Sequence, residues 1–146
     1  MAPASCLISG IFPLSHGSRN TDPSYYATYL SALEFINNDD FINVSVRKYT
    51  ASTDLLFPDN SFVFMVTKAA LPARGDGMLD SIHCTPFLSP SEGFESCYPP
   101  EPTHTAFIIG TISSIDNSGL TRSFTLTTSE YVCNEQCTFN IRYVYP

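Results

Sequence analysis

The segment that decides the fold is the stretch from Thr105 to Tyr145. It reads TAFIIGTISSID, then NSGLTRSFTLTTSEYV, and finally CNEQ followed by CTFNIRYVY. The three runs are rich in β-branched and aromatic residues, and they are separated by Asn117–Gly119 and by Cys133–Gln136. Apolar runs with such breaks between them are typical of strands joined by tight turns. The sequence therefore predicts a β-meander over residues 104–145.

The composition describes a single domain with few charges. The chain has 146 residues, of which 43% are hydrophobic, so residues 1–146 can form one domain with its own core. Eleven Phe, eight Tyr and eleven Pro indicate short strands joined by stiff loops. The net charge of −7 argues against a protein that coats duplex nucleic acid through a basic surface. It leaves room for a local groove that holds a few of the seven cations.

The N-terminal residues and the cysteines favour an intracellular protein, nuclear or cytoplasmic. Residues 1–12 lack the charged start and the long apolar core of a secretory signal. No apolar run reaches the roughly 18 residues that a membrane span needs, so no membrane partner is expected. The cysteines are odd in number and lack the spacing of a disulfide framework; they are Cys6, Cys84, Cys97, Cys133 and Cys137.

One helix is expected, over about residues 23–37. Thr21-Asp22-Pro23 combines an N-cap side chain with a proline in the first turn, where its missing N–H costs nothing. The apolar residues that follow have the spacing of one helical face. These residues are Tyr26, Tyr29, Leu30, Leu33 and Ile36.

Four further stretches are expected to be strands that precede the meander, and two of these are Cys6–Leu14 and Ser81–Leu88. Residues 42–47 alternate between apolar and polar, as in a half-buried strand. Residues 61–67 are apolar on both faces, as in a central strand. The predicted core consists of Leu30, Leu33, Val44, Val46, Phe62, Phe64, Val66, Phe107, Ile109, Leu126 and Ile141.

No catalytic constellation stands out, and no enzyme activity is expected. Cys133 and Cys137, which have three residues between them across a turn, are candidates for half of a zinc site. The candidates for the remaining ligands are His83, Cys84, Cys97 and His104. A spacer of three residues is less diagnostic than two, and no second pair accompanies it. The expectation is therefore buried or unreactive thiols, with no metal and no cofactor.

The remaining chemical pattern combines aromatic rings with a few cations. Alternation places Tyr143 and Tyr145 on one face of the last strand and Arg142 on the other, while Phe124 lies in the preceding strand. Single-stranded nucleic acid binds such surfaces, because each stacked base contributes roughly 1–3 kcal/mol and a guanidinium binds phosphate. The alternative is that the aromatic residues, Phe124 and Phe139 above all, form core. The candidate nucleic-acid-binding residues are Arg47, Lys48, Arg122, Phe124, Arg142, Tyr143 and Tyr145.

The opening stretch also resembles a known family. FIIGTISSI (107–115), RSFTL (122–126) and SEYV (129–132) are similar to the first two strands of an OB-fold, as in single-strand DNA-binding domains of the replication protein A type. The resemblance implies that Gly110 lets the first strand coil around a small barrel and that residues 137–145 form the third strand. An OB barrel has five strands, so the expectation is either a truncated barrel or a sheet that the N-terminal strands and the helix close in a different order. The whole chain is also similar to a group of uncharacterised fungal proteins.

These observations predict an α+β domain made mainly of antiparallel strands, either an OB-like barrel or a partly open meander, with one packed helix. The expected function is non-enzymatic binding of single-stranded nucleic acid through an OB-like sheet. The alternative is a protein-interaction or self-assembling β-module that uses an exposed edge strand to bind another protein or a second copy of itself.

Overall fold

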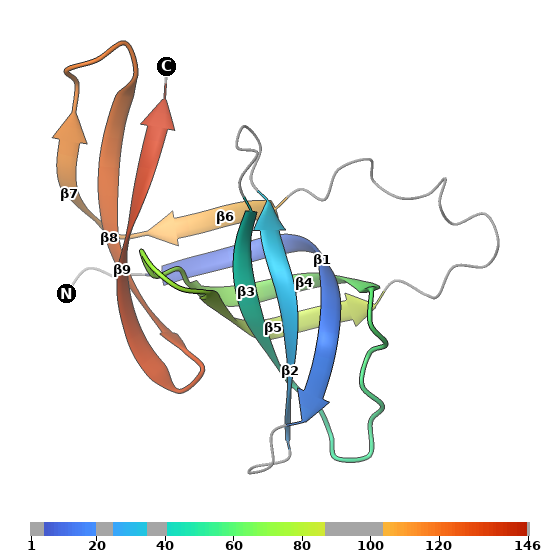
Figure 1. Cartoon of the computed structure of the whole chain (residues 1–146). Helices are drawn as coiled ribbons and strands as arrows, with labels where there is room; N and C mark the ends of the chain where they lie inside the picture. The colour runs from blue at the N-terminus through green and yellow to red at the C-terminus, as the bar shows by residue number, and fades with distance from the viewer. Residues whose placement is uncertain (1–4, 20–24, 35–40, 87–103, 146) are drawn as a thin grey trace.

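The computed structural model describes residues 5–19, 25–34, 41–86 and 104–145, which form nine β-strands in two sheets (Figure 1). The described residues contain no helix, so the protein is all-β rather than the predicted α+β. The strands are β1 (Ser5–Arg19), β2 (Tyr26–Glu34), β3 (Phe41–Tyr49), β4 (Ser61–Ala70), β5 (Gly77–Pro86), β6 (His104–Ile109), β7 (Thr111–Asp116), β8 (Arg122–Val132) and β9 (Glu135–Tyr145).

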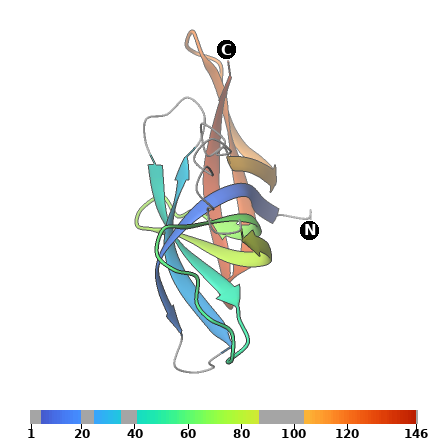
Figure 2. The same ribbon diagram turned by 90° about the vertical axis from the view of Figure 1, so that its right-hand side faces the viewer.

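Five of the strands close into a ring. Their order is β2-β3-β5-β4-β1, and β1 also pairs with β2, which joins the two ends. β1 can reach both neighbours because it is long and curved: Leu7–Leu14 pair with β4, whereas Ser15 and Arg19 pair with β2 (Figures 1 and 2). All neighbours in the ring are antiparallel except β3 and β5, which are parallel. β6 extends the same sheet by pairing with the first half of β1.

The helix predicted over residues 23–37 is wrong. Tyr26–Glu34 is strand β2, which pairs with β3 along its whole length and with the end of β1. Tyr25 lies in the turn before β2, and the other positions of the predicted range lie outside the described residues. The segment fits both periods, since Ala27, Tyr29 and Leu33 lie an even number of residues apart and are the buried side chains. Pairing with two other strands therefore decides the conformation, which local spacing alone leaves open.

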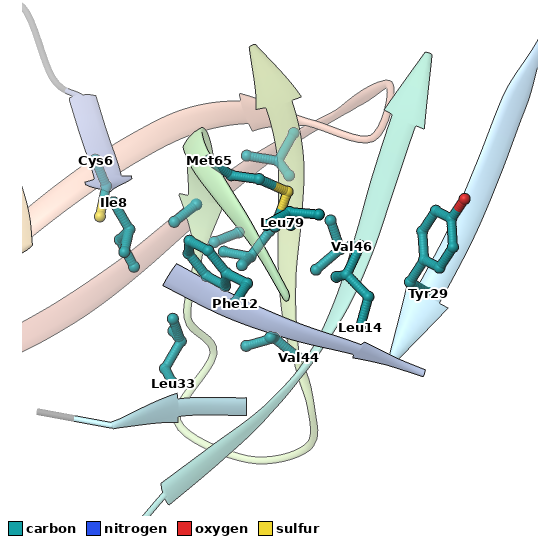
Figure 3. Packing of buried hydrophobic residues seen from close by; sticks show 14 of the residues in the cluster. Cys6, Ile8, Phe12, Leu14, Tyr29, Leu33, Val44, Val46, Met65 and Leu79 are labelled. Carbon is teal, nitrogen blue, oxygen red and sulfur yellow. The ribbon is translucent and has the colours of Figure 1, made fainter. Parts of the chain in front are cut away.

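The hydrophobic core fills the interior of the ring (Figure 3). Phe12 comes from β1, Tyr29 and Leu33 from β2, Met65 from β4 and Leu79 from β5, and all are almost completely buried. Tyr29 also has a polar role at one end of the core, because its hydroxyl accepts a hydrogen bond from the backbone N–H of residue 57 at 3.2 Å.

The predicted core is partly correct. Leu33, Val44 and Val46 are buried as expected. In β4 the buried side chains are Val63 and Met65, one residue out of phase with the prediction. A strand whose facing is assigned one residue out of phase has every side chain on the wrong side. The predicted core residues that are exposed on the outside of the ring are Leu30, Phe64, Phe107 and Ile109.

The second sheet consists of β7, β8 and β9, all antiparallel. The meander predicted over residues 104–145 is thus divided, because β6 belongs to the sheet of the ring and β7 to the second sheet. The chain passes from one sheet to the other at Gly110. A Cβ atom at this position would collide with the backbone oxygen of Thr127, so the close approach of β8 requires a glycine here.

The two sheets are joined through the carboxylate of Glu130 on β8. It accepts hydrogen bonds from Oγ of Ser5 at 2.7 Å and from the backbone N–H of Cys6 at 3.3 Å, and it lies 3.6 Å from Nζ of Lys68. Burial by itself raises the pKa of Glu130, but the hydrogen bonds and the ammonium group outweigh it and lower the pKa below its ordinary value. A charged carboxylate therefore holds β8 against β1 and β4.

Candidate functional site

One face of β8 changes from buried to exposed along the strand. Its even-numbered side chains point to the same side. Val132, Glu130 and Thr128 are buried against the ring, whereas Phe124 is half-buried and Arg122 is exposed. Figure 1 shows why: β7 and the adjoining parts of β8 and β9 extend beyond the ring. The ring covers one part of this face and leaves the other part uncovered.

We call the uncovered part the projecting face. It consists of Ile112, Ile115, Arg122, Phe124, Leu126, Ile141, Tyr143 and Tyr145. Residues directly opposite each other in an antiparallel pair point to the same side, and Ile115 and Tyr143 both lie opposite Phe124. Ile115 and Tyr143 are 62% and 56% exposed. The projecting face is therefore a mainly apolar surface in contact with solvent.

The rings of three predicted binding residues meet on the projecting face. The ring centres of Phe124 and Tyr143 are 5.2 Å apart, those of Phe124 and Tyr145 are 6.1 Å apart, and those of Tyr143 and Tyr145 are 6.2 Å apart. These separations are typical of favourable aromatic contacts. Arg122 lies opposite Tyr145 on the same side of the sheet and adds an exposed guanidinium group. The structure thus brings these four predicted residues together.

Arg142 lies on the opposite face of the sheet. Its Nε donates a hydrogen bond to Oγ of Ser123 at 3.1 Å, and its Nη2 is 3.7 Å from the carboxylate of Asp116. Hydrogen bonds from Ser118, assisted by the charge of Arg142, lower the pKa of Asp116 below its ordinary value. Arg142 neighbours Tyr143 in the sequence, so it points away from the rings and cannot hold the phosphate of a base stacked on them.

Arg47 and Lys48 lie on β3 and contact residues of neighbouring strands and of the segment before β4. The guanidinium group of Arg47 donates two hydrogen bonds to Asp80, at 3.2 and 2.6 Å, and lies 4.6 Å from the centre of the Tyr26 ring. The Asp80 carboxylate raises the pKa of Arg47. The ammonium group of Lys48 lies 5.5 Å from the centre of the Phe57 ring. Both cations are therefore separate from the aromatic group on the projecting face.

A second aromatic group, which the sequence analysis missed, lies on the outer side of the ring. The rings of Tyr25 and Tyr49 stack with their centres 6.4 Å apart, and Tyr26 meets Tyr49 edge-on at 5.9 Å. The signal was present as a Tyr-Tyr pair at one strand end and a tyrosine at the end of the next strand. This aromatic group was not predicted because residues 23–37 were expected to form a helix, and only the pairing of strand β2 with β3 places Tyr26 opposite Tyr49.

The second sheet has two edges. Among the described residues, β7 and β9 each pair only with β8. β7 is short, has an irregular register between Ile112 and Ser114, and ends at Asp116, all of which discourage the addition of another strand. β9 pairs with β8 in unbroken register from Glu135 to Tyr145, so its outer side is the more regular edge.

Burial favours the protonated form of three cysteine thiols in the described residues, those of Cys6, Cys84 and Cys133. Burial raises the pKa of Cys6 to about 11, and burial also raises the pKa of Cys84 and of Cys133. Cys133 lies in the turn between β8 and β9, where its Sγ is 4.0 Å from the carbonyl oxygen of Leu79. In the part of the chain that the structure describes, no three metal-ligating side chains gather; Cys97 lies outside that part.

Two comparisons of this chain with known proteins found no match. No protein-family model matches it, and no curated protein matches it. The ranges that the structure describes hold no helix with the length and apolarity of a membrane span. Fold and surface together define an all-β protein that presents an apolar and aromatic sheet face to solvent.

Proposed function

We propose that this chain is a non-enzymatic binding module that binds a protein partner on the projecting face. The supporting observation is the continuity of one apolar face, of which one part already packs against the ring. Phe124 and Tyr143 continue the side of the sheet on which Val132 and Phe139 are buried. Contiguous exposed apolar surface on a soluble protein marks an interaction site more often than scattered apolar residues do.

The side chains on the projecting face suit a protein partner. Tyrosine and isoleucine contribute apolar area with few rotatable bonds, and a tyrosine hydroxyl at the rim keeps its hydrogen bond to water. Burial of one large apolar side chain contributes about 1.5–3 kcal/mol, before the costs of association are subtracted. Ile112, Ile115 and Tyr143 are each more than half exposed. Most of the free energy of burying these side chains is therefore gained only when a partner covers them.

Selection from a displayed library of random peptides tests the proposal. The full chain is immobilised, and the Kd of each selected peptide is measured by calorimetry. We expect selected peptides to be rich in apolar and aromatic residues and to bind with micromolar Kd. Tyr143→Lys should weaken this binding at least about tenfold, because it places a charge in the centre of the face.

Val144→Lys is the matched control for this test. Val144 is the next residue on the same strand, is 55% exposed, and points to the opposite face. Its substitution should leave peptide binding unchanged. An equal loss of binding in both variants, or a library that yields no binders, would argue against the projecting face as a protein-binding site.

A second candidate function is binding of single-stranded nucleic acid on the same rings. The observation that favours it is the grouping of Phe124, Tyr143 and Tyr145 beside the guanidinium group of Arg122, since bases stack on aromatic side chains and phosphate binds arginine. The resemblance to single-strand DNA-binding domains of the replication protein A type supports this candidate only through residues 122–132 and 137–145, because residues 107–115 are divided between the two sheets. The net charge of −7 means that any attraction for phosphate must be local.

Fluorescence anisotropy at low salt, with a labelled single strand of about 20 nucleotides, tests the second candidate. We expect a Kd in the micromolar range or weaker, little affinity for duplex, and a salt slope near −0.7 for each phosphate contact. Tyr143→Ala should weaken the binding free energy by about 1–3 kcal/mol and leave the salt slope unchanged. Arg122→Ala should make the salt slope shallower by the equivalent of about one phosphate contact. Arg142→Ala, on the opposite face, should change neither quantity. If no binding is seen at high micromolar protein, the protein partner is the better explanation.

A further inference from the structure

We infer that the partner of the projecting face is a second copy of this chain, packed face to face about a twofold axis. This inference rests on the proposed function, since it names the partner of the same surface. Three features of the molecule carry it: the charges around the face, the packing that the same face already makes, and the position of the polar groups of the second sheet.

The charges favour a contact between copies at this surface. With a net charge of −7, two chains repel each other, and this repulsion is smallest where they meet through surfaces without carboxylates. The projecting face includes no carboxylate, and Arg122 is its one charged residue. Asp116, the nearest acid in the pairing pattern, lies opposite Ser123 and therefore on the other side of the sheet with Arg142. Two projecting faces can thus meet without bringing like negative charges together.

The chemistry of the face also limits the other partners it would bind well. A basic protein would find no acid to pair with, and an acidic protein would find a single guanidinium group. A neutral apolar surface is the best complement, and each copy of the chain presents one. In a twofold contact the same surface serves both sides, so the assembly closes at two copies and does not grow into a filament.

The packing against the ring shows what kind of contact this sheet makes. Val132 and Phe139 are buried where the ring covers the face, and Ile141, half-buried, lies at the boundary. Beyond that boundary, a second sheet stacked on the first at about 10 Å would extend the same layer of apolar side chains. The second copy's projecting face supplies such a sheet, and the aromatic group of each copy then packs against the face of the other.

The opposite side of the sheet is suited to remain in water. Arg142 and Asp116 form an ion pair on this side, and each of the two side chains is at least half exposed. Thr125 and Asn140 lie on the same side of the sheet. The two sides of the sheet therefore differ in polarity in the way expected of a sheet covered on one side only.

Sedimentation velocity of the full chain, from about 1 to about 200 µM, tests the inference. We expect a shift from one chain to two chains as the concentration rises, and no larger species. Tyr143→Lys and Ile115→Lys should each raise the Kd of the dimer at least about tenfold. Val144→Lys should dimerise like the unsubstituted chain. Far-UV circular dichroism of every variant establishes that it is folded before its mass is interpreted.

The outcomes separate this inference from the proposed function. One outcome is a protein that stays a single chain at all concentrations, binds the selected peptides, and loses this binding in Tyr143→Lys. This outcome would overturn the dimer but support the projecting face as a protein-binding site. A single chain that binds neither peptides nor nucleic acid would overturn both. A dimer that Val144→Lys disrupts as strongly as Tyr143→Lys would mean that the copies meet through an edge strand or the opposite face, and it would also overturn the inference.

Discussion

The ring and the second sheet use the same kinds of strand but place their apolar side chains in different surroundings. In the ring every strand is hydrogen-bonded on both sides, and inward-facing residues such as Phe12 and Leu79 are fully buried. In the second sheet, β7 and β9 have one neighbour each among the strands that the structure describes, and Ile115 and Tyr143 face solvent. Alternation along a strand therefore predicts that one face is apolar. Whether that face becomes core or binding surface depends on whether a second layer covers it.

The largest expected effect comes from removing one aromatic ring from each region. Phe12→Ala should lower the free energy of unfolding by about 3–5 kcal/mol, because it leaves a cavity inside the ring. Tyr143→Ala should lower that of the single chain by less than about 1 kcal/mol, because much of its side chain is already in water. Urea denaturation at low protein concentration measures both. Equal losses would show that the projecting face is packed as tightly as the core.

A smaller effect is expected where the two regions join. Gly110→Val introduces a Cβ that collides with the backbone oxygen of Thr127, which cannot move without disturbing β8. We expect a loss of on the order of 1–3 kcal/mol, typical of overpacking, together with faster hydrogen exchange in β7. Gly119→Val serves as the comparison, since a Cβ there makes only ordinary contacts. If Gly110→Val exchanges like the unsubstituted chain, the two sheets do not depend on this close approach.

The smallest effect concerns the response of the ring to acid. His104 packs on Phe12 with ring centres 4.6 Å apart, and its Nδ1 lies 3.2 Å from the backbone nitrogen and 3.1 Å from the carbonyl oxygen of Glu34. Burial lowers the pKa of His104 below its ordinary 6.5, so the unfolded chain takes up this proton at a higher pH than the folded chain. The stability that His104 contributes is therefore fully present above about pH 6.5 and is lost as the pH falls towards the folded pKa.

Melting temperatures between about pH 8 and about pH 5 check this expectation. His104→Gln should flatten the decline in melting temperature below about pH 6.5. The projecting face includes no histidine and no carboxylate, so peptide binding measured on folded protein should stay constant across this pH range. An unchanged pH profile in His104→Gln would assign the decline to another group.

The sequence predicted the second sheet better than the ring, for a physical reason. Between Arg122 and Tyr145 the strands are adjacent in the chain and joined by a short turn, so alternation and local spacing were enough to assign their faces. β2 was missed because its sequence fits a helix and a strand equally well, and its pairing with β1 and β3 decided between them. Closure of the ring depends on pairs such as Ile8 with Thr67, which are too far apart in the sequence for local patterns to reveal.

The candidate site was predictable where its residues share one strand, and not where their positions depend on pairing between strands. Tyr143 and Tyr145 were predicted to share a face because alternation along one strand is local, whereas their contact with Phe124 depends on the register between β8 and β9. The role of Arg47 was not predictable, since its partner Asp80 reaches it only through the parallel pairing of β3 with β5. An arginine or lysine can thus be proposed to bind a ligand only after the structure shows whether a carboxylate of the same chain already pairs with it.

The central position of β1 has a consequence for how the protein is made. A chain is synthesised from its N-terminus, so β1 leaves the ribosome well before β4 and β6, with which it pairs through Phe12 to Val63 and Cys6 to Ile108. Until those partners emerge, an apolar strand lacks most of its hydrogen-bonding neighbours. Folding must then form many contacts between distant parts of the chain, which is slow. The nascent protein is therefore most prone to aggregate during synthesis, before the ring can close.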